Sequence, residues 1–179
     1  TSVAGAAAAI SNNSIGVSGV CHNCKIMPVR AGFSIISPFV GAAGILETDD
    51  IVNAIIYATD NGTDVISMSF GTLWSSDLEK DAIDYAYSQG VVLVAAAGNS
   101  NSDQKEYPAG YDNVIAVAAT AKDDTKAFYS NYGSWIDVAA PGGDNKKDSM
   151  IFSTVPKKGT LGNPSGYKSL QGTSMACPY

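Results

Sequence analysis

The chain has 179 residues, of which 45% are hydrophobic and 16% charged, and its net charge is -6 at neutral pH. This length suits one domain that buries about 70% of its unfolded surface, and this composition argues against an intrinsically disordered segment. Because 17 acidic residues stand against 11 scattered basic ones, we expect neither nucleic acid nor an anionic membrane as a partner. No apolar run approaches the roughly 18 residues of a membrane-spanning helix, and no basic-then-apolar leader opens the sequence.

The first 44 residues predict a helix, a strand and connecting loops. TSVAGAAAAI (1–10) is rich in alanine and predicts a helix that ends at the turn-forming SNNSIG (11–16). KIMPVRA (25–31) predicts a short buried strand. ISPFVGAAG (36–44) has the small residues and the proline of a loop.

Two amphipathic helices and five apolar strands are predicted for the rest of the chain. The first helix begins near Thr48 and ends at Gly62, and the second occupies 75–90. Their predicted buried faces are Ile51, Ala54, Ile55 and Ala58 in the first helix and Leu78, Ala82, Tyr85 and Ala86 in the second. The predicted strands occupy 64–70, 91–98, 113–120, 135–142 and 150–156.

The alternation of strands and helices predicts an α/β fold. VVLVAAAG (91–98) is apolar at every position, which is typical of a parallel strand covered on both faces. We therefore expect a three-layer domain over residues 1–179, with a mostly parallel sheet and helices on both faces.

Two motifs with polar residues fall where open parallel sheets bind ligands, beyond the carboxyl ends of the strands, and a third predicts a helix N-terminus. SMSFGT (67–72) overlaps the end of one predicted strand, and AAAGNSN (95–101) overlaps the end of another. GTSMACP (172–178) is a glycine turn followed by small helix formers, which predicts Ser174 at a helix N-terminus. A serine there is open to substrate and has backbone N–H groups beside it that can hold an oxyanion.

Seven motifs, in order along the chain, resemble the subtilisin-like serine peptidases, or subtilases. They are TSVAG, NNSIGVSGV, SMSFG, AAAGN, YPAGYDNVIAVAA, IDVAAPG and GTSMACP. One such match would be weak, but seven in order across residues 1–179 are specific. The resemblance implies a subtilisin-like fold and a serine endopeptidase that hydrolyses polypeptides.

The resemblance assigns roles to residues of these motifs. Ser174 would attack the scissile carbonyl, and Asn99 would donate its side-chain amide to the oxyanion. The pocket for the P1 side chain, which precedes the cleaved bond, would be flanked by Ser69, Phe70, Gly71, Ala96, Ala97 and Gly98. Glu106 would lie at the bottom of this pocket, turned either inward or to solvent. The Tyr107–Pro108 peptide bond would be cis.

The resemblance also implies a structural calcium site in SNNSIGV. Its ligands would be the Asn13 side chain and the backbone carbonyls of Ser11, Ile15 and Val17. These supply about four of the six to eight oxygens that calcium takes, so the site is expected to be incomplete within residues 1–179. The family further implies secretion and a possible propeptide.

The catalytic aspartate and histidine of the family have no match in this sequence. If Thr1 matches the threonine of the family's histidine motif, the catalytic histidine would stand two residues before it and the aspartate farther upstream. We therefore expect residues 1–179 to be a partial catalytic domain, truncated at both ends and inactive by itself. At the other end, Tyr179 stands where the family most often has histidine.

His22 is the only histidine, and it lies in CHNC (21–24), where the family has a loop. We interpret it as a surface residue rather than the missing base. Cys21 and Cys24 form either a small disulfide or two loop thiols, since three ligands in four residues are a poor zinc pattern.

Other functions fit these motifs less well than a protease does. An α/β-hydrolase needs glycine two residues after its nucleophile, and Ala176 stands there. A dinucleotide-binding domain needs G-x-G-x-x-G, which AAAGNSN lacks. Taken alone, Ser174 would be a helix cap and Asn99 a turn residue, and Met175 and Cys177 are expected in the core. A catalytically dead binding module on the same scaffold remains the alternative.

Overall fold

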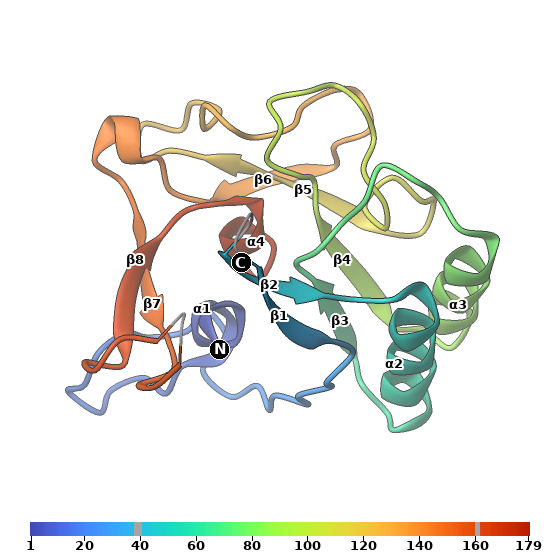
Figure 1. Cartoon of the computed structure of the whole chain (residues 1–179), viewed down its shortest axis with the longest axis horizontal. Helices are drawn as coiled ribbons and strands as arrows, with labels where there is room; N and C mark the ends of the chain where they lie inside the picture. The colour runs from blue at the N-terminus through green and yellow to red at the C-terminus, as the bar shows by residue number, and fades with distance from the viewer. Residues whose placement is uncertain (38–40, 160–161) are drawn as a thin grey trace.

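A parallel sheet of four strands forms the centre of the domain (Figure 1). The computed structural model describes residues 1–37, 41–159 and 162–179. The strands are β3 (Val65–Met68), β4 (Val92–Ala96), β5 (Ile115–Thr120) and β6 (Val138–Pro141), hydrogen-bonded in that order. All three pairings are parallel, so the carboxyl ends of these strands lie along one edge of the sheet.

Helices cover both faces of this sheet and give the three-layer architecture predicted from the sequence. One face packs against α2 (Thr48–Asp60) and α3 (Asp77–Ser88) in a core that includes Leu93 and Ala95 of β4. The opposite face packs against α4 (Thr173–Ala176), and Val94 contributes to that second core. Because successive side chains of β4 enter different cores, the strand is apolar at every position.

A short helix lies beside α4 on the second face (Figure 1). This helix, α1 (Ser2–Ala8), confirms the helix predicted for the alanine-rich start of the sequence. The hydroxyl of Ser153 donates to the Ser2 carbonyl at 2.8 Å, and the hydroxyl of Thr154 donates to the Thr1 carbonyl at 3.0 Å. These bonds tie α1 to a strand near the other end of the chain.

The predicted buried face of α3 was partly wrong. Leu78 and Tyr85 are exposed, whereas Glu79 and Ile83 are buried. An acid can lie on this face because the Tyr111 hydroxyl donates to Glu79 Oε2 at 3.0 Å, although burial still raises the pKa of Glu79. The charged Glu79 interrupts the apolar face of α3, and for this reason the buried face was predicted incorrectly.

The buried face of α2 also differs in part from the predicted one. The buried side chains are those of Val52, Ile55, Ala58 and Thr59, while Ile51 and Ala54 are only partly buried. The helix begins at Thr48, where its start was predicted, and Glu47 occupies the N-cap position. As predicted, Gly62 follows the helix end, with a left-handed φ of 75°.

The strand predicted over 25–31 does not form. Ile26 and Met27 are exposed, and no strand pairs with this segment among the described residues. Without a neighbour to take its backbone hydrogen bonds, an apolar run of this length gains little from the extended conformation. The prediction of a buried strand was therefore wrong for this structure.

Two antiparallel pairs flank the main sheet. β1 (Phe33–Ser37) pairs with β2 (Gly41–Ile45) where a loop was expected over 36–44, and residues 38–40 of that loop lie outside the described residues. β7 (Ile151–Thr154) forms the strand predicted near 150–156, but it pairs with β8 (Tyr167–Leu170), which was not predicted. The short 3-10 helix η1 (Asn145–Lys147) precedes β7.

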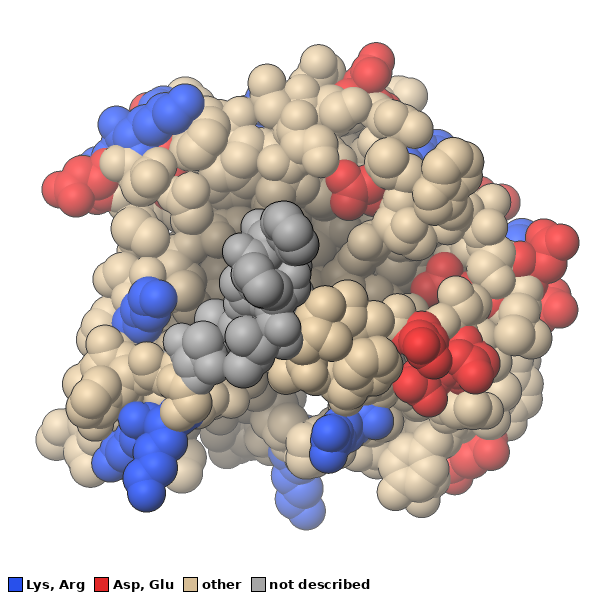
Figure 2. Space-filling model, viewed as in Figure 1, with Lys and Arg blue, Asp and Glu red and all other residues tan. Residues whose placement is uncertain are grey.

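The charged side chains do not form one basic face. Figure 2 shows Lys and Arg in several separate groups on the side facing the viewer. None of the helices in the described ranges is long and apolar enough to cross a membrane.

Candidate active site

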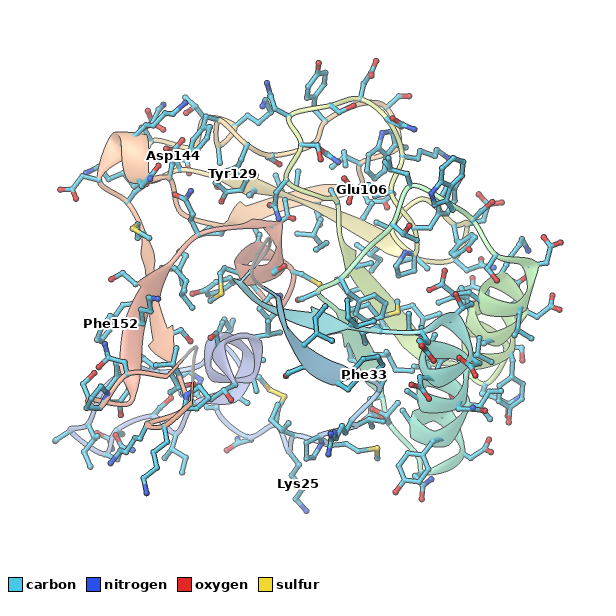
Figure 3. The ribbon with its side chains drawn as sticks, in the orientation of Figure 1. Lys25, Phe33, Glu106, Tyr129, Asp144 and Phe152 are labelled. Atoms are coloured by element: carbon cyan, nitrogen blue, oxygen red, sulfur yellow. A yellow bond between two sulfur atoms is a disulfide. The ribbon has the colours of Figure 1, made fainter. Side chains whose placement is uncertain are left out.

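Ser174 is the second residue of α4, as the glycine turn predicted. The turn depends on Gly172, whose φ of 142° is a conformation that other residues rarely adopt. The Gly172 N–H donates to the Gly142 carbonyl at 3.0 Å and to the Tyr129 hydroxyl at 2.9 Å. Burial raises the pKa of Tyr129 to about 12, so its hydroxyl stays protonated and keeps its 2.6 Å bond to the Gly143 carbonyl. Tyr129 therefore anchors the turn (Figure 3).

Ser174 is paired with the end of β3. Its Oγ donates to the Ser69 carbonyl at 3.1 Å, and the Ser69 Oγ donates to the Ser174 carbonyl at 3.1 Å. Within the described ranges, no imidazole or carboxylate is hydrogen-bonded to Ser174 Oγ. The serine is half-buried, and its hydroxyl is placed at the carboxyl edge of the sheet without a base.

Asn99 is oriented by the residue before the serine. Its Oδ1 accepts from the Thr173 N–H at 2.8 Å and from the Thr173 hydroxyl at 3.0 Å. The same hydroxyl accepts from the Gly98 N–H at 3.2 Å, and Thr173 is fully buried. Because the carboxamide oxygen is fixed in this way, the Asn99 Nδ2 is left as a donor, with no protein partner in the described part of the chain.

Most of the predicted site residues line one cavity of about 280 Å³. Its lining residues are Ser69, Phe70, Gly71, Ala96, Gly98, Asn99, Ser100, Glu106, Thr173 and Ser174. Ala97, which is fully buried, is the predicted P1-pocket residue that does not line this cavity. Residues from three separate stretches of sequence therefore meet beyond the carboxyl ends of β3 and β4.

Glu106 turns inward, toward this cavity (Figure 3). Its Oε1 accepts from the Asn131 Nδ2 at 2.9 Å and from the Ser100 hydroxyl at 3.3 Å. A Cβ at Gly98 would lie 2.4 Å from this carboxyl group, so only glycine fits beside it. The adjacent Tyr107–Pro108 bond is cis, as the resemblance implied.

Asn131 and Thr173 are the residues that sequence reasoning missed. Asn131 is fully buried, and its Oδ1 accepts from the N–H groups of Ser100 and Ser102 at 2.9 and 3.2 Å. Its Nδ2 also donates to the Ala97 carbonyl at 2.9 Å. Thr173 lies within a motif already singled out, but nothing in the SNYG sequence around Asn131 distinguishes it from an ordinary turn.

The remaining candidates lie away from the cavity. His22 is exposed in a loop, as interpreted, and the Cys21–Cys24 pair forms a disulfide. Met175 and Cys177 are buried, which confirms their expected place in the core. The Cys177 Sγ lies 3.5 Å from the Ser67 hydroxyl, and burial raises the pKa of its thiol. A buried, protonated thiol is a poor competitor for the role of nucleophile.

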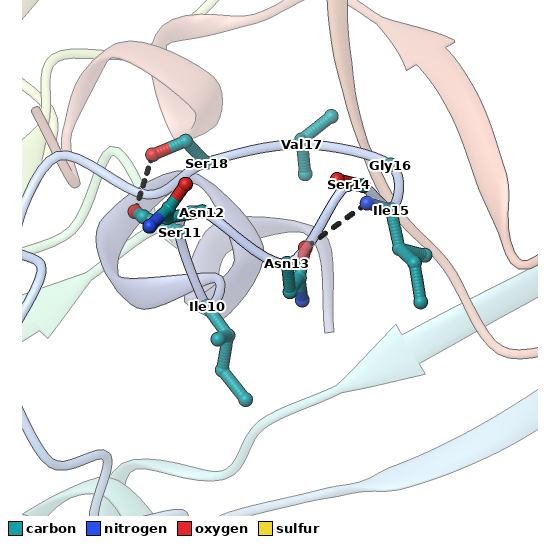
Figure 4. Close-up of a pocket in the computed structure, with 9 residues that line it drawn as sticks. All are labelled: Ile10, Ser11, Asn12, Asn13, Ser14, Ile15, Gly16, Val17 and Ser18. Atoms are coloured by element: carbon teal, nitrogen blue, oxygen red, sulfur yellow. Dashed lines mark hydrogen bonds between the residues drawn. The ribbon is translucent and has the colours of Figure 1, made fainter.

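The loop with the proposed calcium ligands lines a separate cavity of about 280 Å³, formed by residues 10–18 (Figure 4). Its oxygens fit calcium in kind, since they are amide and carbonyl groups. They do not reach the required number, and Asn13 Oδ1 also accepts from the Ile15 N–H at 3.0 Å. No cluster of three or more His, Cys, Asp or Glu residues capable of holding a metal occurs in the described parts of the chain.

Comparison with known proteins finds that this chain is similar to several serine proteases. The whole of residues 1–179 matches the model of the subtilase family. The chain is 43% identical to thermitase of Thermoactinomyces vulgaris over 180 residues, covering 100% of this chain and 57% of thermitase. It is 39% identical to the halolysin-like extracellular serine protease Nep of Natrialba magadii, covering 99% of this chain and 29% of Nep.

A solved structure is also similar. A protease from Pseudoalteromonas arctica superposes with a TM-score of 0.85 at 38% identity, covering 99% of this chain and 54% of that chain. The chain thus spans little more than half the length of thermitase and of this protease, and less of Nep.

The contact between Gly98 and Glu106 makes a prediction about stability. Gly98→Ala adds a methyl group at a position with φ of 105°, where it meets Glu106 and Asn131 at 2.4 Å. We expect a loss in the free energy of unfolding that exceeds the loss for Gly90→Ala by about 1–3 kcal/mol. Gly90 is the matched control, because its φ is 84° and nothing lies within 4 Å of its added Cβ. Equal losses in chemical denaturation would contradict the proposed crowding.

Proposed function

Because the chain belongs to the subtilase family, we propose that the protein carrying it is a serine endopeptidase with Ser174 as its nucleophile. The main support is that Ser174 and the free Asn99 amide open onto one cavity at the carboxyl edge of the sheet. A nucleophile and an oxyanion donor held together on a rigid sheet suit the hydrolysis of a peptide bond.

In the proposed reaction, this chain supplies the nucleophile and the oxyanion donors, and residues outside it supply the base. Ser174 Oγ attacks the scissile carbonyl, and the resulting oxyanion accepts hydrogen bonds from Asn99 Nδ2 and the Ser174 N–H. That N–H belongs to the first turn of α4, where backbone donors have no partner within the helix. The proton of Ser174 passes to a histidine oriented by an aspartate, both supplied by sequence outside residues 1–179.

Covalent labelling with a fluorophosphonate tests this proposal. A protein that carries the chain together with the family's aspartate and histidine motifs should be labelled stoichiometrically, and its Ser174→Ala variant should not. Asn99→Ala should slow labelling and lower kcat with little change in KM, because Asn99 acts in the transition state. Residues 1–179 alone should resist labelling, since an unassisted serine hydroxyl is a weak nucleophile.

Two results would overturn the proposal. Rapid labelling of Ser174 in residues 1–179 alone would mean that a base exists within this chain. Failure of the longer protein to label or to cleave casein would favour the catalytically dead binding module instead.

We extend the proposal to substrate preference through Glu106. A carboxylate lining the P1 pocket favours a basic P1 side chain, and a charge about 4 Å away contributes roughly 1–4 kcal/mol, depending on the local dielectric. Gly98 leaves the space that the carboxylate occupies, because a Cβ at this position would lie 2.4 Å from Glu106 Oε1.

Peptide substrates that differ only at P1 test this preference. Glu106→Gln should lower kcat/KM for P1 Lys about tenfold or more and leave P1 Phe nearly unchanged, because only the charged pair is lost. A wild-type protein that prefers Phe to Lys and is indifferent to Glu106→Gln would refute it.

We also propose that calcium binds the loop at residues 11–17 when residues outside the chain complete its ligands. The Asn13 side chain and the carbonyls of Ser11, Ile15 and Val17 would hold it, and the bound ion would stabilise the loop. The loop packs against β8, since a Cβ at Gly16 would meet the ring of Tyr167 at 2.3 Å.

Thermal melting of the longer protein tests the calcium proposal. At about 100 times Kd, calcium should contribute roughly 2.7 kcal/mol, so a chelator should lower the melting temperature. Asn13→Ala should remove most of this dependence, and Asn61→Ala, at an exposed helix end, should keep it. A melting temperature that ignores the chelator would exclude the site.

The proposed setting is extracellular. A disulfide between Cys21 and Cys24 is typical of oxidising compartments, and Nep is named as an extracellular protease. The proposed partners are polypeptide substrates and, during maturation, a propeptide.

A further inference from the structure

The two oxygens of the Glu106 carboxylate are not equivalent. Oε1 accepts from the Asn131 Nδ2 at 2.9 Å and from the Ser100 hydroxyl at 3.3 Å. Oε2 accepts no hydrogen bond within the described parts of the chain, and it faces Gly71 at the cavity wall. A ligand in the cavity therefore meets a carboxylate with one oxygen already occupied.

Asn131 is built to hold this orientation. It is fully buried, and its side chain makes four hydrogen bonds, to Ala97, Ser100, Ser102 and Glu106. Its backbone N–H donates to the Gly98 carbonyl at 3.0 Å, which adds a fifth bond. A carboxamide with both ends satisfied cannot rotate without losing several bonds at once, so its Nδ2 stays directed at Oε1.

We propose that Asn131 is a positioning residue that makes Glu106 a one-oxygen acceptor and thereby selects lysine over arginine at P1. The proposal rests on the protease function and the Glu106 preference above, and it adds which basic residue is preferred and why.

The selection follows from the shapes of the two cations. Arginine binds a carboxylate best through two parallel N–H bonds, one to each oxygen. Oε1 cannot take part, because Asn131 and Ser100 already use it. The lysine ammonium is a compact point charge that needs one oxygen, and Oε2 supplies it. Some N–H groups of an arginine in this cavity would have no hydrogen-bond partner. A donor without a partner lowers the affinity where bound substrate excludes water.

The ratio of kcat/KM for P1 Lys to that for P1 Arg measures this effect in the protein that includes the aspartate and histidine motifs. We expect a wild-type ratio of about ten, the size of one hydrogen bond to a charged group. Asn131→Leu has a similar shape to asparagine and no charge, and it cannot donate to Oε1. Its ratio should fall close to one.

Two milder variants give a matched pair. Ser100→Ala removes the second donor to Oε1 at an exposed position, so its ratio should fall part of the way. Ser102→Ala removes a hydroxyl from the same loop. This hydroxyl accepts from the Gln104 N–H and does not contact Glu106, so the Lys:Arg ratio of the variant should equal that of the wild type. If Asn131→Leu fails to fold, the comparison of these two variants decides the question.

A double-mutant cycle separates positioning from general loop damage. In a Glu106→Gln background, Asn131→Leu should no longer change the Lys:Arg ratio, because the group through which it acts has lost its charge. An equal effect in both backgrounds would mean that Asn131 acts on the loop as a whole, and would overturn the proposal.

Other outcomes distinguish this proposal from those on which it rests. Equal cleavage after Lys and Arg, with both lowered by Glu106→Gln relative to Phe, would refute the role of Asn131 and leave the role of Glu106 standing. No effect of Glu106→Gln on any substrate would refute both roles. Absence of cleavage of every substrate would refute the protease function and this inference with it.

Discussion

Thr173 joins the two halves of the candidate site through hydrogen bonds that span 74 residues of sequence. Its hydroxyl and its N–H both reach Asn99, and the hydroxyl also takes the Gly98 N–H. Since Thr173 is fully buried, loss of these bonds would leave polar groups without partners in the interior. This contact fixes the distance between the serine on α4 and the amide beyond β4, and the proposed chemistry depends on that distance.

The rest of the fold keeps the two sides of this contact rigid. β4 is an inner strand of the sheet and its side chains enter both cores, so the loop that follows it starts from a strand packed on both faces. On the other side, Tyr129 and Gly142 hold the N–H of Gly172. A site supported in this way on sheet and helix loses little entropy when substrate binds, which is the usual requirement for an oxyanion donor set before the reaction.

Most of the fold could be predicted from sequence motifs and from the pattern of apolar residues. The four strands of the main sheet and the helix at Ser174 were predicted because their signals are local. The strand at 25–31 was not formed and β8 was not foreseen, because pairing depends on neighbours that a local pattern does not contain. In the candidate site, Glu106 was anticipated, whereas its inward orientation depends on Asn131, which is 25 residues away and has no distinguishing sequence signal.

Thr173 holds Asn99 and Ser174 as one unit, because its N–H and its hydroxyl both donate to Asn99 Oδ1. The most direct test compares kcat for Thr173→Val and Thr173→Ser in the protein that includes the family's aspartate and histidine motifs. Valine keeps the shape of threonine and loses the hydroxyl bonds to Asn99 and Gly98, so kcat should fall at least about tenfold. Serine keeps the hydroxyl and should retain most of the activity. A Thr173→Val variant with the kcat of the wild type would contradict the account.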